Sequence, residues 1–236
     1  MKSFFKVSAL LEALYEEQPE LALQVVLVPS LSDAHHDTVY PQPPLNDQVA
    51  GGVPSPFFPD EKLFRLALPL TKAGPAKRLH VVGNPSLLQI NEVVVAVTST
   101  DVLMHLGKEE IALRPVASNR IERLVEHMVL QQSFYPLYPA PVASDAPPLD
   151  MRFNDKWRMP VSPDLLLTPS RLATFARRLP NGTLAVNPGQ LSKGSAGGTY
   201  ATLTVQPMAK GHVEKAHAAP LPHEIASRTA VQIKRI

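Results

Sequence analysis

The sequence contains no cysteine among its 236 residues. Disulfides and thiolate zinc sites are therefore excluded, and a metal ion could be held only by His, Asp or Glu side chains. Long apolar runs are also absent: none approaches the roughly 20 residues of a membrane span. Lys6 and Glu12 interrupt the apolar residues near the N-terminus, and no small-residue cleavage site follows. The sequence therefore predicts neither a membrane span nor a signal peptide.

Proline, by contrast, is abundant. The chain has 25 prolines, about twice the average usage of roughly 5%. Because proline fixes φ and lacks a backbone N–H, we expect extended segments and fixed loops and not a bundle of long helices. The apolar content of 44% is ordinary for a globular protein and is sufficient for a sizeable core.

Charge is unevenly distributed along the chain. Residues 1–150 hold 11 Lys/Arg against 17 Asp/Glu, a formal charge of −6, and residues 151–236 hold 12 against 4, a formal charge of +8. One interpretation is that the basic half faces nucleic acid or an acidic partner. The other is that the halves neutralise each other within one fold, which the scattered positions of the basic residues favour.

The hydrophobic pattern predicts an α/β protein. Residues 3–17 have apolar side chains at helical spacing, and residues 21–28 form a short β-branched run that is typical of a strand buried on both faces. Further strands are predicted at 80–82, 87–90, 93–98, 165–168, 184–186, 199–205 and 230–233, with a tight turn at Asn91-Glu92. Further helices are predicted from about residue 100, at 118–132 with Ser118 as N-cap, and at 171–179.

Several segments carry side chains that could perform chemistry. His35 and His36 are adjacent, so in an extended chain they point to opposite faces, although Asp33 could share one face with His35. The segment "TSTD" at 98–101 has no nucleophile-elbow pattern, and Ser99 or Thr100 is expected to cap the next helix. The Gly-rich segment 187–198 has the wrong order for a phosphate-binding P-loop, so we expect a turn between strands. His212, His217 and His223 match no ligand spacing.

A cluster of aromatic and proline residues follows the helix predicted at 118–132. It reads "QSFYPLYPAP" over residues 132–141. Rigid aromatic side chains flanked by prolines suit a partner interface, and equally a structural corner under the sheet. Tyr40, Tyr135 and Tyr138 are the interface candidates.

Six colinear segments resemble one known family. They are "VPSLSDAHHDTVYPQPPL" (28–45), "TSTDVLMHLG" (98–107), "QSFYPLYP" (132–139), "SPDLLLTPSRL" (162–172), "VNPGQLSKGSAGGTYATL" (186–203) and "AVQIKRI" (230–236). Together they are similar to the C-terminal part of the B subunits of eukaryotic DNA polymerase alpha-primase. The resemblance implies a calcineurin-like metallophosphoesterase fold, a layered β-sandwich flanked by helices, of which this chain would be the C-terminal portion.

The resemblance also implies that the phosphoesterase site is degenerate. Active relatives end a strand with Gly-Asn-His-Asp, whereas residues 30–33 read Ser-Leu-Ser-Asp, and a leucine cannot coordinate a dication. Their Gly-His-x-His has its counterpart at 169–172, where Arg171 would add a positive charge at the place of two cations. Loss of several ligands should abolish two-metal hydrolysis. The degenerate positions are Leu31, Ser32, Asp33, Thr98, Ser99, Ser170 and Leu172, and no catalytic residue, metal or cofactor is expected.

The implied function is that of a non-catalytic accessory subunit in the nucleus. It would bind the C-terminal domain of the polymerase catalytic subunit, connect to primase through the complex, and support initiation of DNA replication, and its contact with DNA could be indirect. Residues 1–236 would form part of the inactivated domain, with a disordered insertion at 41–77 and a hairpin excursion at 207–228, and the family's OB-fold domain absent from this chain. The alternative is an active metal-dependent phosphoesterase or nuclease that uses Asp33, His35, His36 and Asp101. A further alternative is direct DNA binding by the basic half.

Overall fold

The computed structural model describes residues 9–11, 13–14, 16–18, 20, 23–33, 36–45, 79–113, 119–142, 145–209, 211 and 223–236. The chain divides into two compact units, residues 1–29 with 43–83 and residues 30–42 with 84–236. No helix in the described part of the chain is long and apolar enough to cross a bilayer. His35, most of the predicted insertion (46–77) and most of the hairpin excursion (210 and 212–222) lie outside the described residues.

The first unit contains a short parallel pair, β1 (Val25–Leu27) and β2 (Leu79–Val81). The sequence predicts that β1 is buried on both faces, but Val26 is 38% exposed. That expectation is wrong, because a strand paired along one edge in a small sheet leaves part of its surface open. Of the helix predicted over 3–17, residues 9–11, 13–14 and 16–17 are described and helical.

The second unit is built on a mixed five-stranded sheet. Its strand order is β3 (Ser86–Ile90), β4 (Val93–Val97), β5 (Leu165–Leu167), β7 (Leu184–Asn187) and β6 (Phe175–Arg178). The three central strands are parallel, and the outer two are antiparallel to their neighbours. The central strands are apolar runs, as expected of parallel strands covered on both faces. The predicted α/β class is confirmed at this level.

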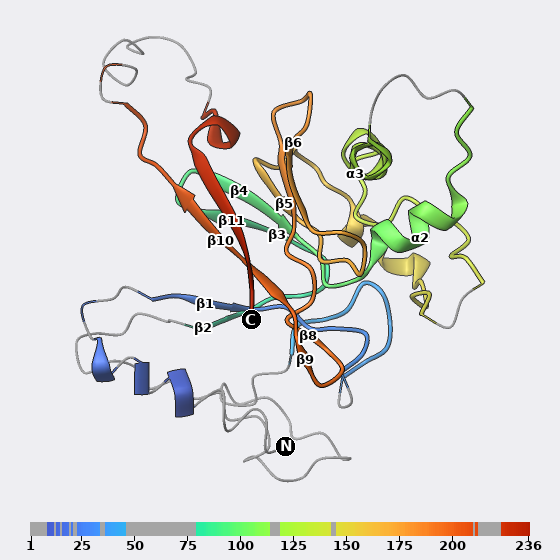
Figure 1. Ribbon diagram of the computed structural model, residues 1–236. Coiled ribbons are helices and arrows are strands. Elements are labelled where there is room, and N and C mark those ends of the chain that lie inside the picture. Colours follow the sequence, from blue (N-terminus) through green and yellow to red (C-terminus); the bar gives the residue numbers. More distant parts are fainter. Residues whose placement is uncertain are drawn as a thin grey trace. The chain divides into compact units, whose positions relative to one another are not determined.

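Two hydrophobic clusters cover the two faces of this sheet. Side chains such as Val95, Leu165 and Val186 pack with the antiparallel ribbon of β10 (Thr199–Val205) and β11 (Thr229–Arg235). The alternate residues, Ala96 and Leu166 among them, pack with α2 (Val102–Glu109) and α3 (Arg120–Leu130). Because side chains alternate between the faces of a strand, the ribbon and the helices cover opposite faces (Figure 1). The unit therefore has three layers.

Three details of the sequence prediction are corrected. Residues 175–178 form the edge strand β6 and not part of a helix over 171–179, because pairing with β7 outweighs local helix propensity. Asp101, and not Ser99 or Thr100, caps α2, and Asn119, and not Ser118, caps α3. In both cases the carboxylate or amide oxygen nearest the first turn accepts the orphan backbone N–H.

The remaining elements are short. The Asn91-Glu92 turn joins β3 to β4 as predicted, with Asn91 at a φ of 53°. The Gly-rich segment forms the predicted turn between strands, here β8 (Ser192–Lys193) and β9 (Ala196–Gly197). Two 3-10 helices, η2 (Met151–Trp157) and η3 (Ile225–Ser227), complete the described elements and were not predicted.

Candidate functional site

The carboxyl ends of β4, β5 and β7 meet at one edge of the sheet, because these three strands are parallel neighbours. The loops that follow carry Thr98 and Ser99 after β4, and Ser170 and Leu172 after β5. The structure therefore brings together four of the positions predicted from the sequence. Asn187, the last residue of β7, was not predicted; it accepts the Ser170 backbone N–H at 2.9 Å and donates to the Leu172 carbonyl at 3.3 Å.

A buried amide organises the start of this edge. Asn84 is fully buried, and its Oδ1 accepts hydrogen bonds from Thr98 Oγ1 and Ser99 N, each at 3.0 Å. Its Nδ2 donates to Gln42 Oε1 and Thr100 Oγ1, each at 3.2 Å. Sequence reasoning missed Asn84, because an isolated Asn-Pro pair predicts only a turn. Since all its hydrogen-bonding capacity is used by protein groups, Asn84 is a structural residue of the edge.

The loop at residues 30–33 also uses its polar groups internally. Asp33 Oδ2 accepts the Ser30 backbone N–H at 2.8 Å, which closes the turn, and Gln42 Nε2 donates to the Ser30 carbonyl at 2.9 Å. Leu31 packs against the helix-side hydrophobic cluster, and Ser32 is exposed. Leu31 therefore contributes packing to the core.

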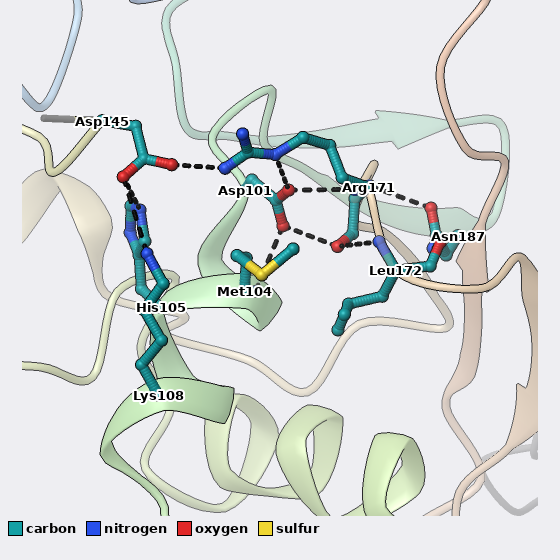
Figure 2. A network of polar contacts seen from close by, with 9 residues as sticks. Asp101, Met104, His105, Lys108, Asp145, Arg171, Leu172 and Asn187 are labelled. Atoms are coloured by element: carbon teal, nitrogen blue, oxygen red, sulfur yellow. Dashed lines mark hydrogen bonds and ion pairs between the residues drawn. The ribbon is translucent and has the colours of Figure 1, made fainter. Parts of the chain in front are cut away.

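Asp101 is the most heavily used carboxylate of the edge. Its Oδ1 accepts from Met104 N at 3.2 Å, as the cap of α2, and from Ser170 Oγ at 2.6 Å. Its Oδ2 accepts from the backbone N and the side-chain Nε of Arg171, at 2.9 and 3.3 Å. Figure 2 shows both oxygens turned toward these donors. The side chain thus joins a helix N-terminus to the loop after β5.

Arg171 continues the network from Asp101 to Asp145. Its Nη2 donates to Asp145 Oδ2, and the other carboxylate oxygen, Oδ1, lies 3.5 Å from His105 Nε2 and 3.8 Å from Lys108 Nζ (Figure 2). The Arg171 guanidinium holds the pKa of the Asp145 carboxyl below its usual value. One protein cation therefore bridges the two carboxylates of this edge, and Lys108 balances the remaining charge.

His105 lies beneath Asp145 and is 1% exposed. Its Nδ1 is 3.1 Å from the hydroxyl of Tyr135, which is also buried. Burial lowers the pKa of the His105 imidazole, and this effect exceeds the opposing attraction of Asp145. A sequence signal for His105 did exist: it falls among Val102, Leu103 and Leu106 on the apolar face of α2. Asp145, in a Pro/Ala-rich linker, carries no such signal.

The carboxylates of this edge accept hydrogen bonds from protein groups. Among the residues that the structure describes, no three His, Asp or Glu side chains gather as a possible metal site. Of the four residues of the phosphoesterase alternative, Asp101 is bonded to Arg171, Asp33 closes its own turn, and His35 lies outside the described residues. Chemically, Arg171 neutralises the Asp101 and Asp145 carboxylates, and these contacts hold together the three loops that carry the residues.

The three tyrosines predicted at an interface are placed very differently. Tyr40 is fully buried, with its ring 5.6 Å from that of Tyr135 and 5.7 Å from that of Trp157, and Tyr135 is 2% exposed. These two candidates are therefore corrected to core residues, because a buried ring is not available to a partner. Tyr138 is 75% exposed and beside a surface pocket of about 660 Å³, so its interface role stays a prediction.

Comparison with known proteins gives a consistent family. The family of DNA polymerase alpha/epsilon B subunits matches residues 2–177. The B subunit of DNA polymerase alpha from Rattus norvegicus is 37% identical over 192 residues, which is 79% of this chain and 27% of the relative. The protein of the same name from Mus musculus is 38% identical over 184 residues, 76% of this chain and 26% of the relative.

The match extends to fungi. The B subunit of DNA polymerase alpha from Schizosaccharomyces pombe is 31% identical over 235 residues, which is 96% of this chain and 36% of the relative. This chain therefore spans little more than a quarter of the length of the mammalian relatives and little more than a third of the fungal one.

Proposed function

Because the chain belongs to the family of DNA polymerase alpha/epsilon B subunits, we propose that it acts in DNA replication as a non-catalytic accessory subunit of the DNA polymerase alpha-primase complex. The relatives named above are subunits of DNA polymerase alpha, and their agreement across mammals and a yeast supports membership of that complex. Replication takes place in the nucleus of such organisms, and the nucleus is the proposed location.

The observation that carries the non-catalytic interpretation is the position of Arg171. Its guanidinium bonds both Asp101 and Asp145 at the carboxyl edge of the sheet. In a two-metal hydrolase, carboxylates at such an edge would be ligands of the ions that activate water. A divalent ion here would have to displace the arginine and would meet its positive charge at close range. Leu31 and Leu172, which pack against the core, offer no ligand atom.

The three-layer arrangement supports a metallophosphoesterase-like origin. A mixed sheet lies between helices on one face and a β ribbon on the other, and polar loops gather at the carboxyl ends of its parallel strands. In open α/β sheets such edges are the usual place for active sites. We propose that the 236 residues form part of one such domain, and that the edge of its sheet carries structural hydrogen bonds in place of catalytic groups.

The proposed partner is the C-terminal domain of the polymerase catalytic subunit, through which primase would be connected. We propose that the surface around Tyr138 takes part in this contact. Tyr138 is exposed beside the pocket whose wall includes Met151, itself 43% exposed, and the buried Trp157. An exposed tyrosine next to a hollow lined by both apolar and polar side chains has the composition of an interface anchor.

Two measurements on the purified 236-residue chain test the proposal. The first is hydrolysis of bis(p-nitrophenyl) phosphate with added manganese, together with calorimetric titration of manganese. We expect no turnover above a protein-free control and no stoichiometric metal binding. The second is capture of the catalytic subunit's C-terminal domain by the immobilised chain, which we expect to succeed.

The phosphoesterase alternative makes the opposite predictions. Turnover with stoichiometric manganese, lost in an Asp33→Asn variant that still folds, would overturn the non-catalytic assignment. Failure to capture the polymerase domain, with the chain folded by circular dichroism, would refute the proposed partner.

A further inference from the structure

A second hollow, of about 460 Å³, adjoins the Arg171 network at the same edge of the sheet. Its wall is formed by the loop after β5, residues 170–174, and by the Gly-rich segment at 189–199. Lys193 and Arg235 line it from β8 and β11. The proposed accessory role makes no use of these two cations.

The hollow has an excess of positive charge. Three cations line it, Arg171, Lys193 and Arg235, and none of its lining residues is acidic. The charge of Arg171 is matched by Asp101 and Asp145. Lys193 and Arg235 form no ion pair with the described part of the chain. Their two charges are therefore available to an anion from outside.

The strand register directs Arg235 toward the hollow. Arg235 lies opposite Thr199 in the β10–β11 ribbon, two residues beyond the Ala201–Ile233 pair. Ala201 packs on the sheet, and side chains on alternate residues share a face, so Arg235 is on the sheet-facing side of the ribbon. Its neighbour Lys234 is on the opposite side, away from the hollow.

Two glycines allow the segments that form the wall of the hollow to pack closely. A Cβ at Gly198 would lie 1.9 Å from the Gln190 carbonyl oxygen, and a Cβ at Gly189 would lie 2.3 Å from Thr199 Oγ1. Gly189 also has a φ of +78°, which favours glycine. Gly198 therefore packs directly against backbone and Gly189 against the Thr199 side chain, and neither position has room for a Cβ.

From these observations we infer that the hollow binds a backbone phosphate of nucleic acid. An ammonium and a guanidinium that form no ion pair with the described residues, and that line one cavity of about 460 Å³, suit a phosphate group. No aromatic side chain lines the cavity, so base stacking and base readout are not offered, and binding should be independent of sequence. The charge of +8 over residues 151–236 favours a polyanion over a small monovalent anion.

This inference goes beyond the proposed function, because it assigns a direct contact with nucleic acid that an accessory subunit does not require. The experiment is fluorescence anisotropy of the 236-residue chain with a labelled single-stranded oligodeoxynucleotide of mixed sequence, and with its duplex, from about 50 to 200 mM salt. The test variant is the double replacement Lys193→Ala with Arg235→Ala. The matched control is Lys234→Ala, which removes a charge from the same strand but from its other face.

The loss of two phosphate contacts predicts a specific change in the salt dependence of binding. For the single strand, the slope of log K against log salt should become less negative by about 1.4, and affinity should fall about 25-fold at 0.1 M salt, since each contact contributes about 0.7 to the slope. For the duplex the change in slope should be about 1.8. A change with only one of the two probes identifies the form of nucleic acid that the hollow takes.

The Lys234→Ala control should change the slope by less than about 0.5 and should keep the affinity within about threefold of that of the unmodified chain. Equal affinity and slope for the double variant and the unmodified chain, with both folded, would overturn the inference. So would an equal loss in the Lys234→Ala variant, because the effect would then be general charge and not this hollow. Capture of the polymerase domain should be unchanged by the double variant, so failure of this site is distinguishable from failure of the proposed function.

Discussion

Arg171 shows how a single residue can determine what the edge of a sheet does. It donates to Asp101 from both its backbone and its side chain, and to Asp145 from the far end of its guanidinium. The planar guanidinium presents donors in fixed directions, so one side chain can hold two carboxylates that a lysine would contact only singly. At residue scale, the edge is therefore a set of satisfied ion pairs and caps.

The first prediction concerns Asp101. The Asp101→Ala variant loses the cap of α2 and the hydrogen bonds from Ser170 and Arg171. We expect the free energy of unfolding in urea to fall by about 2.5–4 kcal/mol, since a cap contributes about 1 and a charged hydrogen bond about 1.5–3. Asp101→Asn keeps an oxygen for the cap and should lose about half as much.

A matched control is available in Asp155→Ala, which removes a carboxylate that is 64% exposed and paired with Lys156 across the surface. Its stability should stay within about 0.5 kcal/mol of the unmodified chain. If Asp101→Ala changes the free energy of unfolding as little as this control does, the network does not stabilise the fold.

The second prediction is a pH dependence that arises from His105. Burial lowers its pKa in the folded state, so the unfolded chain binds the proton more readily. The contribution of His105 to stability is therefore complete above the unfolded pKa of about 6.5 and is lost as pH falls toward the lower folded pKa. The groups that face the ring are Asp145, Lys108 and the hydroxyl of Tyr135.

In His105→Gln, which cannot take up a proton, the urea midpoint should decrease less between pH 7 and pH 5.5 than in the unmodified chain. His127→Gln, in the last turn of α3, is the control for replacing a histidine elsewhere in the chain. An equal decrease of the urea midpoint in His105→Gln and in the unmodified chain would show that the buried imidazole is not responsible for the pH dependence. The lowered pKa of Asp145 has the same sign, but its effect appears only in the more acidic range where carboxylates titrate.

At the scale of the elements, the two helices are joined end to end by a charged cluster. Glu110, just after α2, is 7% exposed and accepts from Arg120 Nε at 3.2 Å and Arg123 Nε at 3.0 Å in the first turn of α3. Helix α3 then buries Leu124 and Met128 against the sheet. The position of α3 is thus set at its N-terminus by polar contacts and along its length by apolar packing.

The third prediction tests the start of α3. Asn119 Oδ1 accepts the Ile121 backbone N–H at 3.0 Å. Replacement by Ala should lower the free energy of unfolding by about 1 kcal/mol, because one of the first N–H groups of the helix loses its partner. Asn119→Ser retains an acceptor and should be nearly neutral. Equal losses in both variants, measured in urea, would indicate that the amide serves another contact and not the cap.

At the scale of the whole molecule, the candidate contact surfaces of the second unit lie apart from the faces of the sheet that form its core. Helices and ribbon cover the two faces of the sheet, the carboxyl edge carries the Arg171 network and the cationic hollow, and the pocket beside Tyr138 is formed by segments 131–138 and 151–160. The hollow beside Tyr138 has a mixed polar and apolar lining, whereas the other hollow is basic, so the two surfaces suit different partners.

The fourth prediction concerns the surface around Tyr138. Tyr138→Ala should weaken binding of the polymerase catalytic subunit's C-terminal domain about tenfold or more, as expected for a tyrosine anchor. Stability should change little, because the side chain is 75% exposed. Tyr200→Ala, which removes a 42% exposed tyrosine from β10, is the control. Unchanged affinity in a pull-down titration of Tyr138→Ala would remove this residue from the interface.

The sequence by itself determined the strongly patterned elements. The apolar runs at 93–98, 165–168 and 184–186 predict the strands β4, β5 and β7, and helical periodicity over 118–132 predicts α3, because a repeat of apolar side chains indicates which face is buried. The six colinear segments were also enough to identify the family. Element ends were less accurate: the caps fell to Asp101 and Asn119, since several neighbouring polar residues can fill that role.

Only the tertiary structure decided which distant residues meet. Arg171 contacts Asp101 and Asp145, which are 70 and 26 residues away, and no local pattern reports such a pairing. Residues 175–178 became a strand because β7 offered an edge, and Tyr40 became a core residue because Tyr135 and Trp157 cover it. Local sequence sets propensity and periodicity, whereas pairing, burial and charge compensation depend on what the rest of the chain brings alongside.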